Sequence, residues 1–364
     1  MTTRLIDLDV HFHESLSTLS EYFDEPWRTR LQEGGTYAEF GFGPGGGSGD
    51  RGVGGRVKRE QDGERGDVVD TSYPNAGMTP EEIPDGMEYL GVDQCLVLSH
   101  KLLGAGSYVA DDERLGQLAK GSAEYMLDHV LDPSAGIYSA LPVPYSDVDA
   151  SLDLIERLGT EEAFRGIYMV TGGVEPPLGN RKYEPIYELA EEMGLPVVFH
   201  TGGSGLDSYH TKGYSKFIET HTLGFLESNM SQLTSLLIQG IPEKFPDLKM
   251  VFLESGVFWV GALGQRLDTE YLKRQSEAPL LEQRPSDYIR DRFYFGTQPI
   301  ENPRNPDHME AAIEMLGGAD SLMYASDYPH WDFDRPQSIT DLEFLSDAEK
   351  ERIMWRNAAE VFDL

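Results

Sequence analysis

The sequence predicts an α/β chain folded as a (β/α)₈ barrel, and three observations support this. Eight short apolar runs recur along the chain, amphipathic helical patterns lie between several of them, and 364 residues with 39% hydrophobic residues suffice for one large core. Near-continuous apolar runs are typical of parallel strands buried on both faces. The runs cover 4–11, 94–100, 136–144, 164–171, 195–202, 248–256, 293–299 and 321–329.

Four segments between these runs have the apolar spacing of amphipathic helices. Residues 151–158 open on Ser151, which we expect to be the N-cap, and residues 183–194 close on Gly194. Residues 230–245 and 306–317 show the same spacing. A doubly wound open sheet is the rival fold, but the sequence lacks its glycine-rich fingerprint after the first strand.

The interval between the first two runs is too long for a single helix. A Gly-rich, charged stretch at 39–67 lies within an excursion at about 35–85. We expect this excursion to be flexible, with a lid over the barrel mouth as the alternative. Its glycines match no phosphate-loop spacing. Apart from the excursion, residues 1–364 are expected to form a single barrel domain.

The composition excludes several classes of function. The net charge is −33, from 63 acids and 30 bases, which argues against binding to nucleic acid or to anionic membranes. There is no apolar window of about 20 residues and no secretory leader, so we expect a cytoplasmic protein. The single cysteine, Cys95, excludes an internal disulfide and a cysteine-cluster metal site. It lies in an apolar run and is expected to be buried and inert.

The acidic, lysine-poor composition is similar to that of halophilic proteins, in which salt screens the repulsion between acids. We therefore expect the melting temperature to rise between low salt and about 2 M KCl, because screening removes that repulsion. Thermal denaturation followed by circular dichroism measures this. A melting temperature that falls or stays flat would contradict the halophile interpretation and leave an ordinary acidic protein.

Acids and imidazoles stand at the ends of four predicted strands. Asp9 and His11 alternate on the first, so they share a face, while His200, Glu254 and Asp327 end the fifth, sixth and eighth. The C-terminal strand ends of such a barrel surround its reaction site. Converging carboxylates and imidazoles suit a divalent ion such as Zn²⁺ or Mn²⁺.

Five motifs resemble the amidohydrolase superfamily, in particular the amidohydrolase-related branch that includes aminocarboxymuconate-semialdehyde decarboxylase and resorcylate decarboxylase. They are "DLDVHFHES", "VVFHTG", "KFPDLKMVFLESGVFWV", "RPSDYIRDRFYFGTQP" and "ASDYPHWD". The resemblance implies a distorted (β/α)₈ TIM barrel of the metal-dependent hydrolase type, with one divalent ion at its mouth. Zn²⁺ is the first choice and Mn²⁺ the alternative. It also implies that Asp9, His11, His200 and Asp327 are the metal ligands and that Asp327 moves protons.

The same resemblance suggests residues around these ligands. His13 is expected in an outer shell, although His11 and His13 could instead form the imidazole pair that binds the metal. Glu14 and His330, which lies near the rim, are expected to support the ligands without binding the metal themselves. His100 and His210 are weaker candidates near the rim.

One departure concerns the catalytic histidine that better-known members carry after the sixth strand. Here that position reads "LESGVFW", with Glu254 in place of the imidazole. Glu254 can replace it only if burial raises its pKa. His221, which we expect in the loop before the next helix, is the other catalytic candidate.

The favoured function is non-oxidative decarboxylation of a small carboxylated substrate that could be aromatic, since the resemblance points to that branch. Metal-assisted hydrolysis of an amide, ester or lactone is the alternative. A non-catalytic metal- or ligand-binding barrel is the third hypothesis. The resemblance also makes a homodimer a candidate assembly.

Some residues near the predicted rim have two interpretations. Phe12, Trp259, Tyr328 and Trp331 could line a pocket for a planar ring, but we favour core or dimer packing for them. Arg165 and Arg181, near the fourth strand, could meet a substrate carboxylate, but surface ion pairing is favoured.

Overall fold

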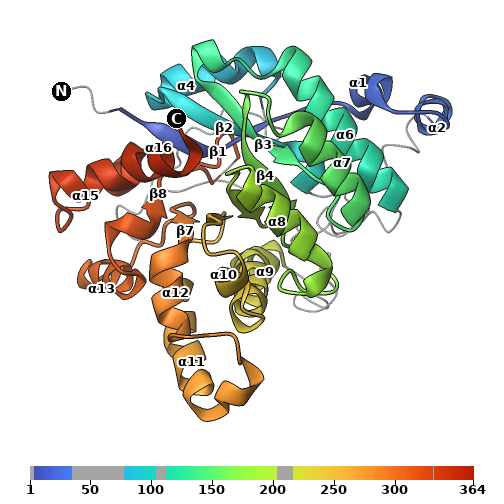
Figure 1. The fold of residues 1–364 in the computed structure, drawn as a ribbon. Helices are drawn as coiled ribbons and strands as arrows, with labels where there is room; N and C mark the ends of the chain where they lie inside the picture. Colours follow the sequence, from blue (N-terminus) through green and yellow to red (C-terminus); the bar gives the residue numbers. More distant parts are fainter. Residues whose placement is uncertain (1–3, 35–77, 104–111, 203–215, 331) are drawn as a thin grey trace.

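The computed structural model describes residues 4–34, 78–103, 112–202, 216–330 and 332–364. Its centre is one sheet of eight parallel strands in sequence order (Figure 1). The strands are β1 (Ile6–Phe12), β2 (Gln94–Ser99), β3 (Ile137–Pro142), β4 (Phe164–Val170), β5 (Val197–His200), β6 (Met250–Leu253), β7 (Phe293–Gly296) and β8 (Leu322–Met323).

The sheet curves round until its last strand meets its first. Beyond the short β8, the backbone NH of Leu8 donates to the Tyr324 carbonyl (3.2 Å), and that of His11 donates to the Tyr328 carbonyl (2.8 Å). In return, Asp327 donates its NH to the carbonyl of Asp9 (2.8 Å). These bonds confirm the predicted (β/α)₈ barrel, because they leave the sheet without an open edge between its first and eighth strands.

Helices surround the barrel on its outer side (Figure 1). The α-helices are α1 (Leu16–Leu19), α2 (Trp27–Gly34), α4 (Ile83–Leu90), α6 (Asp112–His129), α7 (Val148–Leu158), α8 (Glu184–Glu192), α9 (Phe217–Ile238), α10 (Ile241–Lys244), α11 (Phe258–Arg274), α12 (Pro285–Arg292), α13 (Asp307–Leu316), α14 (Gln337–Thr340), α15 (Asp347–Glu351) and α16 (Asn357–Phe362). The 3₁₀ helices are η1 (Ser20–Tyr22), η2 (Pro80–Glu82), η3 (Pro133–Ala135), η4 (Arg181–Tyr183), η5 (Gln275–Glu277) and η6 (Ala319–Ser321), and η7 (Arg352–Arg356) is a π-helix.

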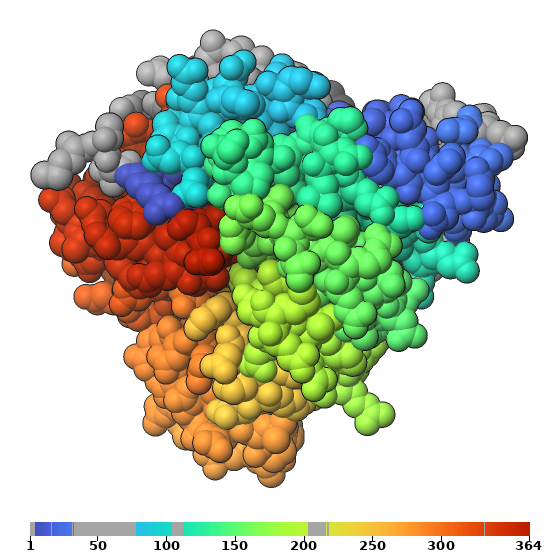
Figure 2. Space-filling view, turned by 45° about the horizontal axis from the view of Figure 1, so that its top comes forward, coloured from blue at the N-terminus to red at the C-terminus, as the bar shows by residue number. Residues whose placement is uncertain are grey.

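The C-terminal helices close the fold against its beginning. Helix α16 contacts both β1 and β8, and the space-filling view shows the red C-terminal segment beside the blue start of the chain (Figure 2). None of the helices in the described ranges is long and apolar enough to cross a membrane. The predicted excursion falls mainly on 35–77, outside the described residues, whereas η2 and α4 occupy its last part.

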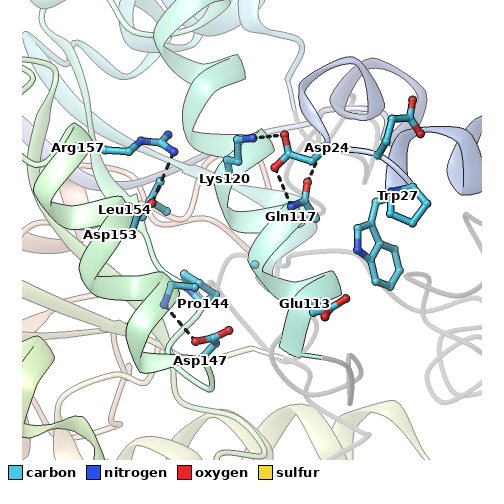
Figure 3. A pocket seen from close by; sticks show the side chains of 14 residues that line it. Asp24, Trp27, Glu113, Gln117, Lys120, Pro144, Asp147, Asp153, Leu154 and Arg157 are labelled. Carbon is cyan, nitrogen blue, oxygen red and sulfur yellow. Dashed lines mark hydrogen bonds and ion pairs between the residues drawn. The ribbon is translucent and has the colours of Figure 1, made fainter.

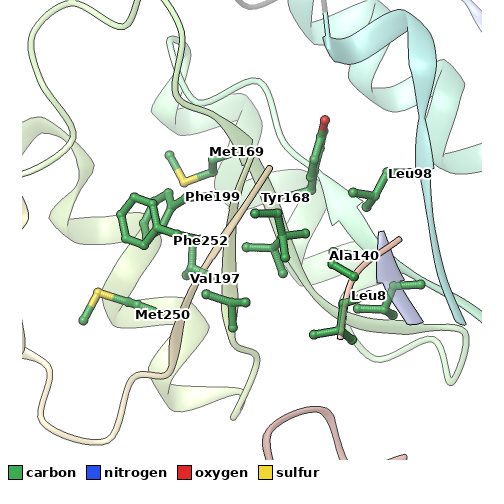
Figure 4. Packing of buried hydrophobic residues seen from close by; sticks show 14 of the residues in the cluster. Leu8, Leu98, Ala140, Tyr168, Met169, Val197, Phe199, Met250 and Phe252 are labelled. Carbon is green, nitrogen blue, oxygen red and sulfur yellow. The ribbon is translucent and has the colours of Figure 1, made fainter. Parts of the chain in front are cut away.

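Apolar side chains fill the space around the strands. Phe199 and Phe252, on neighbouring strands, pack with ring centroids 4.9 Å apart, close to Met169 and Met250 (Figure 4). Cys95 is fully buried, and burial holds the pKa of its thiol well above the usual value, which confirms the expectation of a buried cysteine.

Three details differ from the sequence predictions. The N-cap of α7 is Asp147 and not Ser151, because the Asp147 carboxylate accepts the Ala150 NH (3.1 Å), while Ser151 is buried one turn later. Helix α9 begins at Phe217, well before the predicted 230, and Gly240 (φ 72°) separates it from α10. Only Leu322–Met323 of the predicted eighth run form a regular strand.

A buried amide ties α9 to the ends of two strands. The Nδ2 of Asn229 donates to the Leu253 carbonyl (2.8 Å) and to Ser255 Oγ (2.9 Å), and its Oδ1 accepts from Thr171 Oγ1 (2.7 Å). Asn229 is fully buried, so water cannot replace these partners without opening the structure.

We expect Asn229→Leu to lower the free energy of unfolding by about 2–4 kcal/mol, because it leaves several buried polar groups without partners. The midpoint of urea unfolding measures the loss. The exposed Asn302→Ala is the control and should change stability by less than about 0.5 kcal/mol. Equal midpoints for both variants would show that the amide network contributes nothing to stability.

Candidate metal centre

The four predicted ligands come together at the C-terminal end of the barrel. Asp9 Oδ1 lies 3.1 Å from the Nε2 atoms of both His11 and His200, and His11 Nε2 lies 3.0 Å from Asp327 Oδ1. All four side chains are buried. Residues of β1, β5 and the segment after β8, far apart in sequence, therefore share one centre.

Two overlapping groups of donor atoms could each hold a divalent cation. Asp9, His11 and His200 form one group whose ligand atoms lie within 4.8 Å of one another, and His11, Asp327 and His330 form a second. The Nδ1 of His200 contacts the Thr201 carbonyl, which can only accept, so Nδ1 carries the proton and the Nε2 lone pair is available as a ligand. Asp9 Oδ2 makes no hydrogen bond to any described residue. These residues fit a metal bound by nitrogen and oxygen.

The acids and imidazoles of the cluster change one another's pKa. Burial opposes ionisation of Asp9, but the imidazoles of His200 and His11 lower the pKa of this carboxyl below its usual value. Burial and the negative charge of Asp9 hold the pKa of Asp327 well above its usual value. A divalent cation would allow both carboxylates to ionise together.

Two of the acids have a left-handed backbone conformation. Glu254 (φ 58°) and Asp327 (φ 62°) are non-glycine residues with positive φ, and each follows its strand directly or within a few residues. Such conformations are uncommon outside glycine and cluster at functional sites. Here they turn both carboxylates toward the centre, since Glu254 Oε2 lies 3.5 Å from His200 Nδ1.

Two side chains hold the carboxylate of Asp327. His330 Nδ1 lies 2.5 Å from Asp327 Oδ1, and Gln298 Nε2 donates to Oδ2 over 3.3 Å. The His330 ring also stacks on His11, with centroids 4.4 Å apart. Its Nε2 lies 3.4 Å from His100 Nδ1. His330, expected to support the ligands from near the rim, contacts Asp327 directly and also belongs to the second group of potential ligands.

The backbone before Asp327 is anchored by a buried acid that the sequence analysis missed. Asp7 Oδ1 accepts the NH groups of Ser326 (2.9 Å) and Asp9 (3.2 Å). Burial raises the pKa of Asp7 to about 7. The sequence does indicate this residue, because Asp7 is an acid two positions before Asp9 on the same apolar strand. Gln298, beside Asp327, was also missed, and its place after β7 gave no comparable signal.

The remaining predicted residues lie around the cluster. Glu14 is buried and accepts hydrogen bonds from Ser99 Oγ and from the NH of Lys101 (3.1 Å). It therefore holds the end of β2 in place and does not contact a proposed metal ligand through these bonds. His13 belongs to neither of the two groups of potential ligands among the described residues, and its ring lies 5.6 Å from that of His100. The geometry therefore favours Asp9 with His11 as the ligand pair of the first strand over His11 with His13. His210 lies outside the described residues.

The two candidates for the missing imidazole occupy different places. Glu254 adjoins His200, and burial together with the charge of Asp327 holds its pKa well above the usual value. His221 lies within α9 and not in a preceding loop, which corrects the prediction. Its Nε2 is 3.2 Å from Asp332 Oδ2.

The aromatic and basic candidates are mostly structural. Phe12 is fully buried, and Trp259 is buried with its Nε1–H donated to the Gly256 carbonyl (3.0 Å), as core packing requires. Tyr328 packs edge-on against Phe333, with centroids 5.1 Å apart. Arg165 is 3.8 Å from Asp363 and stacks on Tyr138, which is the surface pairing that we favoured.

Arg181 begins the short helix η4 and is exposed. Trp331 lies outside the described residues. Neither residue therefore adds to the described site.

A surface cavity of about 390 Å³ lies elsewhere, between the segment before α2 and helices α6 and α7 (Figure 3). None of the predicted ligands lines it. Its basic side chains already have acidic partners, since Lys120 Nζ is 2.7 Å from Asp24 and Arg157 NH2 is 2.9 Å from Glu124. We assign it no part in the chemistry of the cluster.

Comparisons with known proteins identify the family and the fold. The family model described as Amidohydrolase matches residues 6–364. The gamma-resorcylate decarboxylase of Polaromonas sp. is 22% identical over 265 residues, which cover 70% of this chain and 79% of that protein.

Two solved structures show the same fold. An amidohydrolase from Mycobacterium avium subsp. paratuberculosis has a TM-score of 0.71 and 16% identity, with 100% of both chains covered. A dihydroxybenzoic acid decarboxylase from Polaromonas sp., solved with manganese and the inhibitor 2-nitroresorcinol, has a TM-score of 0.70 and 18% identity. That match covers 100% of this chain and 97% of the other.

Proposed function

Because the chain belongs to the amidohydrolase family, we propose that it is a metal-dependent carboxy-lyase that removes CO₂, without oxidation, from a small carboxylated aromatic substrate. The observation that carries this proposal is the convergence of Asp9, His11, His200 and Asp327 at the barrel mouth. The decarboxylase names of one relative and one similar structure support lyase chemistry over hydrolysis.

Asp9, His11, His200 and Asp327 would hold one divalent ion, Zn²⁺ or Mn²⁺. Imidazole and carboxylate ligands suit both ions, and the manganese of the similar decarboxylase makes Mn²⁺ the first to test. When bound, such an ion supplies Lewis-acid polarisation of substrate oxygens.

Asp327 is the proposed acid and base of the reaction. It would deliver a proton to the ring carbon that bears the carboxylate, forming a C–H bond from ring electrons. The bond to the carboxylate then breaks, its electron pair restores the ring, and CO₂ leaves as a neutral molecule. Asp327 regains its proton from water, so one proton is consumed in each turnover.

The neighbours of Asp327 would keep it in place for this transfer. His330 and Gln298 contact its two oxygens, so the carboxyl cannot rotate freely. Glu254, whose pKa is raised by burial, is proposed to fill the position of the missing imidazole as a neutral acid. His221, which lies on α9 and is paired with Asp332, is the alternative.

A substrate panel tests the reaction class. Metal-loaded protein is incubated with hydroxybenzoates, and separately with short amides and lactones, while released CO₂ and newly formed acid groups are measured. We expect CO₂ from at least one hydroxybenzoate. Hydrolysis of an amide or lactone without any CO₂ release would overturn the proposal. The small-molecule substrate and a homodimeric assembly both remain predictions, and light scattering tests the second.

A further inference from the structure

Two buried tyrosine hydroxyls on the β3–β4 side of the barrel have no partner among the described residues. Tyr168, in β4, is 3% exposed, and Tyr145, just after β3, is 5% exposed. Neither hydroxyl makes a hydrogen bond within the described ranges. An unpaired hydroxyl in the interior costs about 1–3 kcal/mol, so proteins rarely keep one without a water or ligand to satisfy it.

Strand register places Tyr168 on the inner face of the barrel. Val170 pairs with His200 and Tyr168 pairs with Val198, without a bulge between them. Side chains alternate along a strand, so Tyr168 points to the same side as His200. Their ring centroids are 5.9 Å apart. Figure 4 shows the Tyr168 hydroxyl directed away from the neighbouring apolar side chains.

Both phenols stay neutral donors over the working pH range of a protein. Burial, reinforced by the charges of Asp9 and Glu254, holds the pKa of Tyr168 well above its usual value. Burial is the main cause that raises the pKa of Tyr145, and the neighbouring Tyr183 is the smaller one. The backbone brings the two residues together, because the NH of Val143 donates to the Tyr168 carbonyl (3.3 Å) and the NH of Tyr145 donates to the Val143 carbonyl (2.9 Å).

Other tyrosines in the same part of the barrel have partners. Tyr183 donates its hydroxyl to the Pro176 carbonyl (2.9 Å), and Tyr187 donates to the Leu178 carbonyl (2.8 Å). Arg165, the nearest basic candidate in the sequence, lies instead against Asp363. Burial alone therefore does not leave a tyrosine hydroxyl without a partner in this part of the barrel.

We propose that Tyr168 and Tyr145 form a neutral donor pair that binds an acceptor oxygen of the substrate at the β3–β4 side of the barrel mouth. The acceptor is an oxygen of the substrate carboxylate or of a ring hydroxyl. The pair would select substrates that present such an oxygen beside His200, without adding a positive charge to the site. This inference deepens the proposed function and rests on it for the identity of the ligand.

Calorimetric titration of Mn²⁺-loaded protein tests the pair. The probes are 2,6-dihydroxybenzoate, benzoate and resorcinol, because benzoate lacks the hydroxyls and resorcinol lacks the carboxylate. We expect Tyr168→Phe to weaken 2,6-dihydroxybenzoate binding by roughly 3- to 30-fold, as the loss of one hydrogen bond implies. A loss that persists with benzoate identifies the carboxylate as the acceptor, and one that persists with resorcinol identifies a hydroxyl.

Tyr187→Phe is the matched control, because it removes a buried hydroxyl that already has a protein partner. It should lower the melting temperature and leave probe affinity unchanged. Tyr168→Phe should do the reverse, with an unchanged or higher melting temperature, because its hydroxyl has no protein partner to lose.

Each outcome decides the inference. Equal affinities of wild type, Tyr168→Phe, Tyr145→Phe and the double variant would overturn it and leave the proposed function intact. Failure of the wild type to bind any of the three probes would also overturn it. Tyr168-dependent binding without any CO₂ release would support the donor pair and refute the carboxy-lyase proposal instead.

Discussion

Replacing Asp327 with asparagine should reduce turnover by roughly 10²–10⁴-fold, the usual contribution of a positioned acid or base. The amide that replaces the carboxyl cannot exchange the proton that the reaction needs. The fold should survive because Asp327 has a φ of 62°, a region that asparagine tolerates as readily as aspartate. Steady-state CO₂ release with the best substrate of the panel measures the effect.

Two readouts separate the loss of chemistry from other losses. Circular dichroism should show an unchanged fold, and Asp9, His11 and His200 should still retain metal. The exposed Asp341→Asn is the matched control and should keep full activity. An Asp327→Asn enzyme that turns over at a rate near that of the wild type would remove Asp327 from its role as acid and base.

His200→Ala should have the second large effect, at least a tenfold loss of metal affinity. Removal of an outer-shell partner alone typically costs about 10–100-fold, and His200 supplies a ligand atom directly. The imidazole is buried, with Nε2 3.1 Å from Asp9 Oδ1 and Nδ1 in contact with the Thr201 carbonyl, so its Nε2 is directed at the proposed metal position. Turnover should fall together with metal occupancy.

The metal content of the variant is measured by plasma emission after dialysis against metal-free buffer. His308→Ala changes an exposed histidine on α13 and serves as the control, with undiminished metal and activity. Undiminished metal in His200→Ala would exclude this residue from the ligand set.

Much of the site could be predicted because strand ends and alternation are local properties. Asp9 and His11 alternate on one strand, and their convergence follows from a period of two. His200 and Asp327 end apolar runs, and a barrel gathers such ends at one mouth. The sequence could not show which oxygens face which nitrogens, since Asp9 and His200 are separated by 191 positions and meet only through the closed sheet.

The features that the sequence does not predict also have physical reasons. The left-handed conformations of Glu254 and Asp327 depend on tertiary contacts and leave no mark in an apolar run. The sequence predicts a loop at His221 because the polar first turns of α9 weaken its helical pattern. Tyr168 lies inside the apolar run at 164–171, and the register with β5 shows that it points inward.

Metal content of the wild-type protein tests the central claim most directly. Protein purified without chelators and with both Zn²⁺ and Mn²⁺ supplied during growth is analysed by plasma emission, and its activity is followed as a chelator removes the ion. The cluster of two carboxylates and two imidazoles predicts about one divalent ion per chain, with activity lost and regained in step with occupancy. Fully active protein without a bound divalent ion would contradict the account.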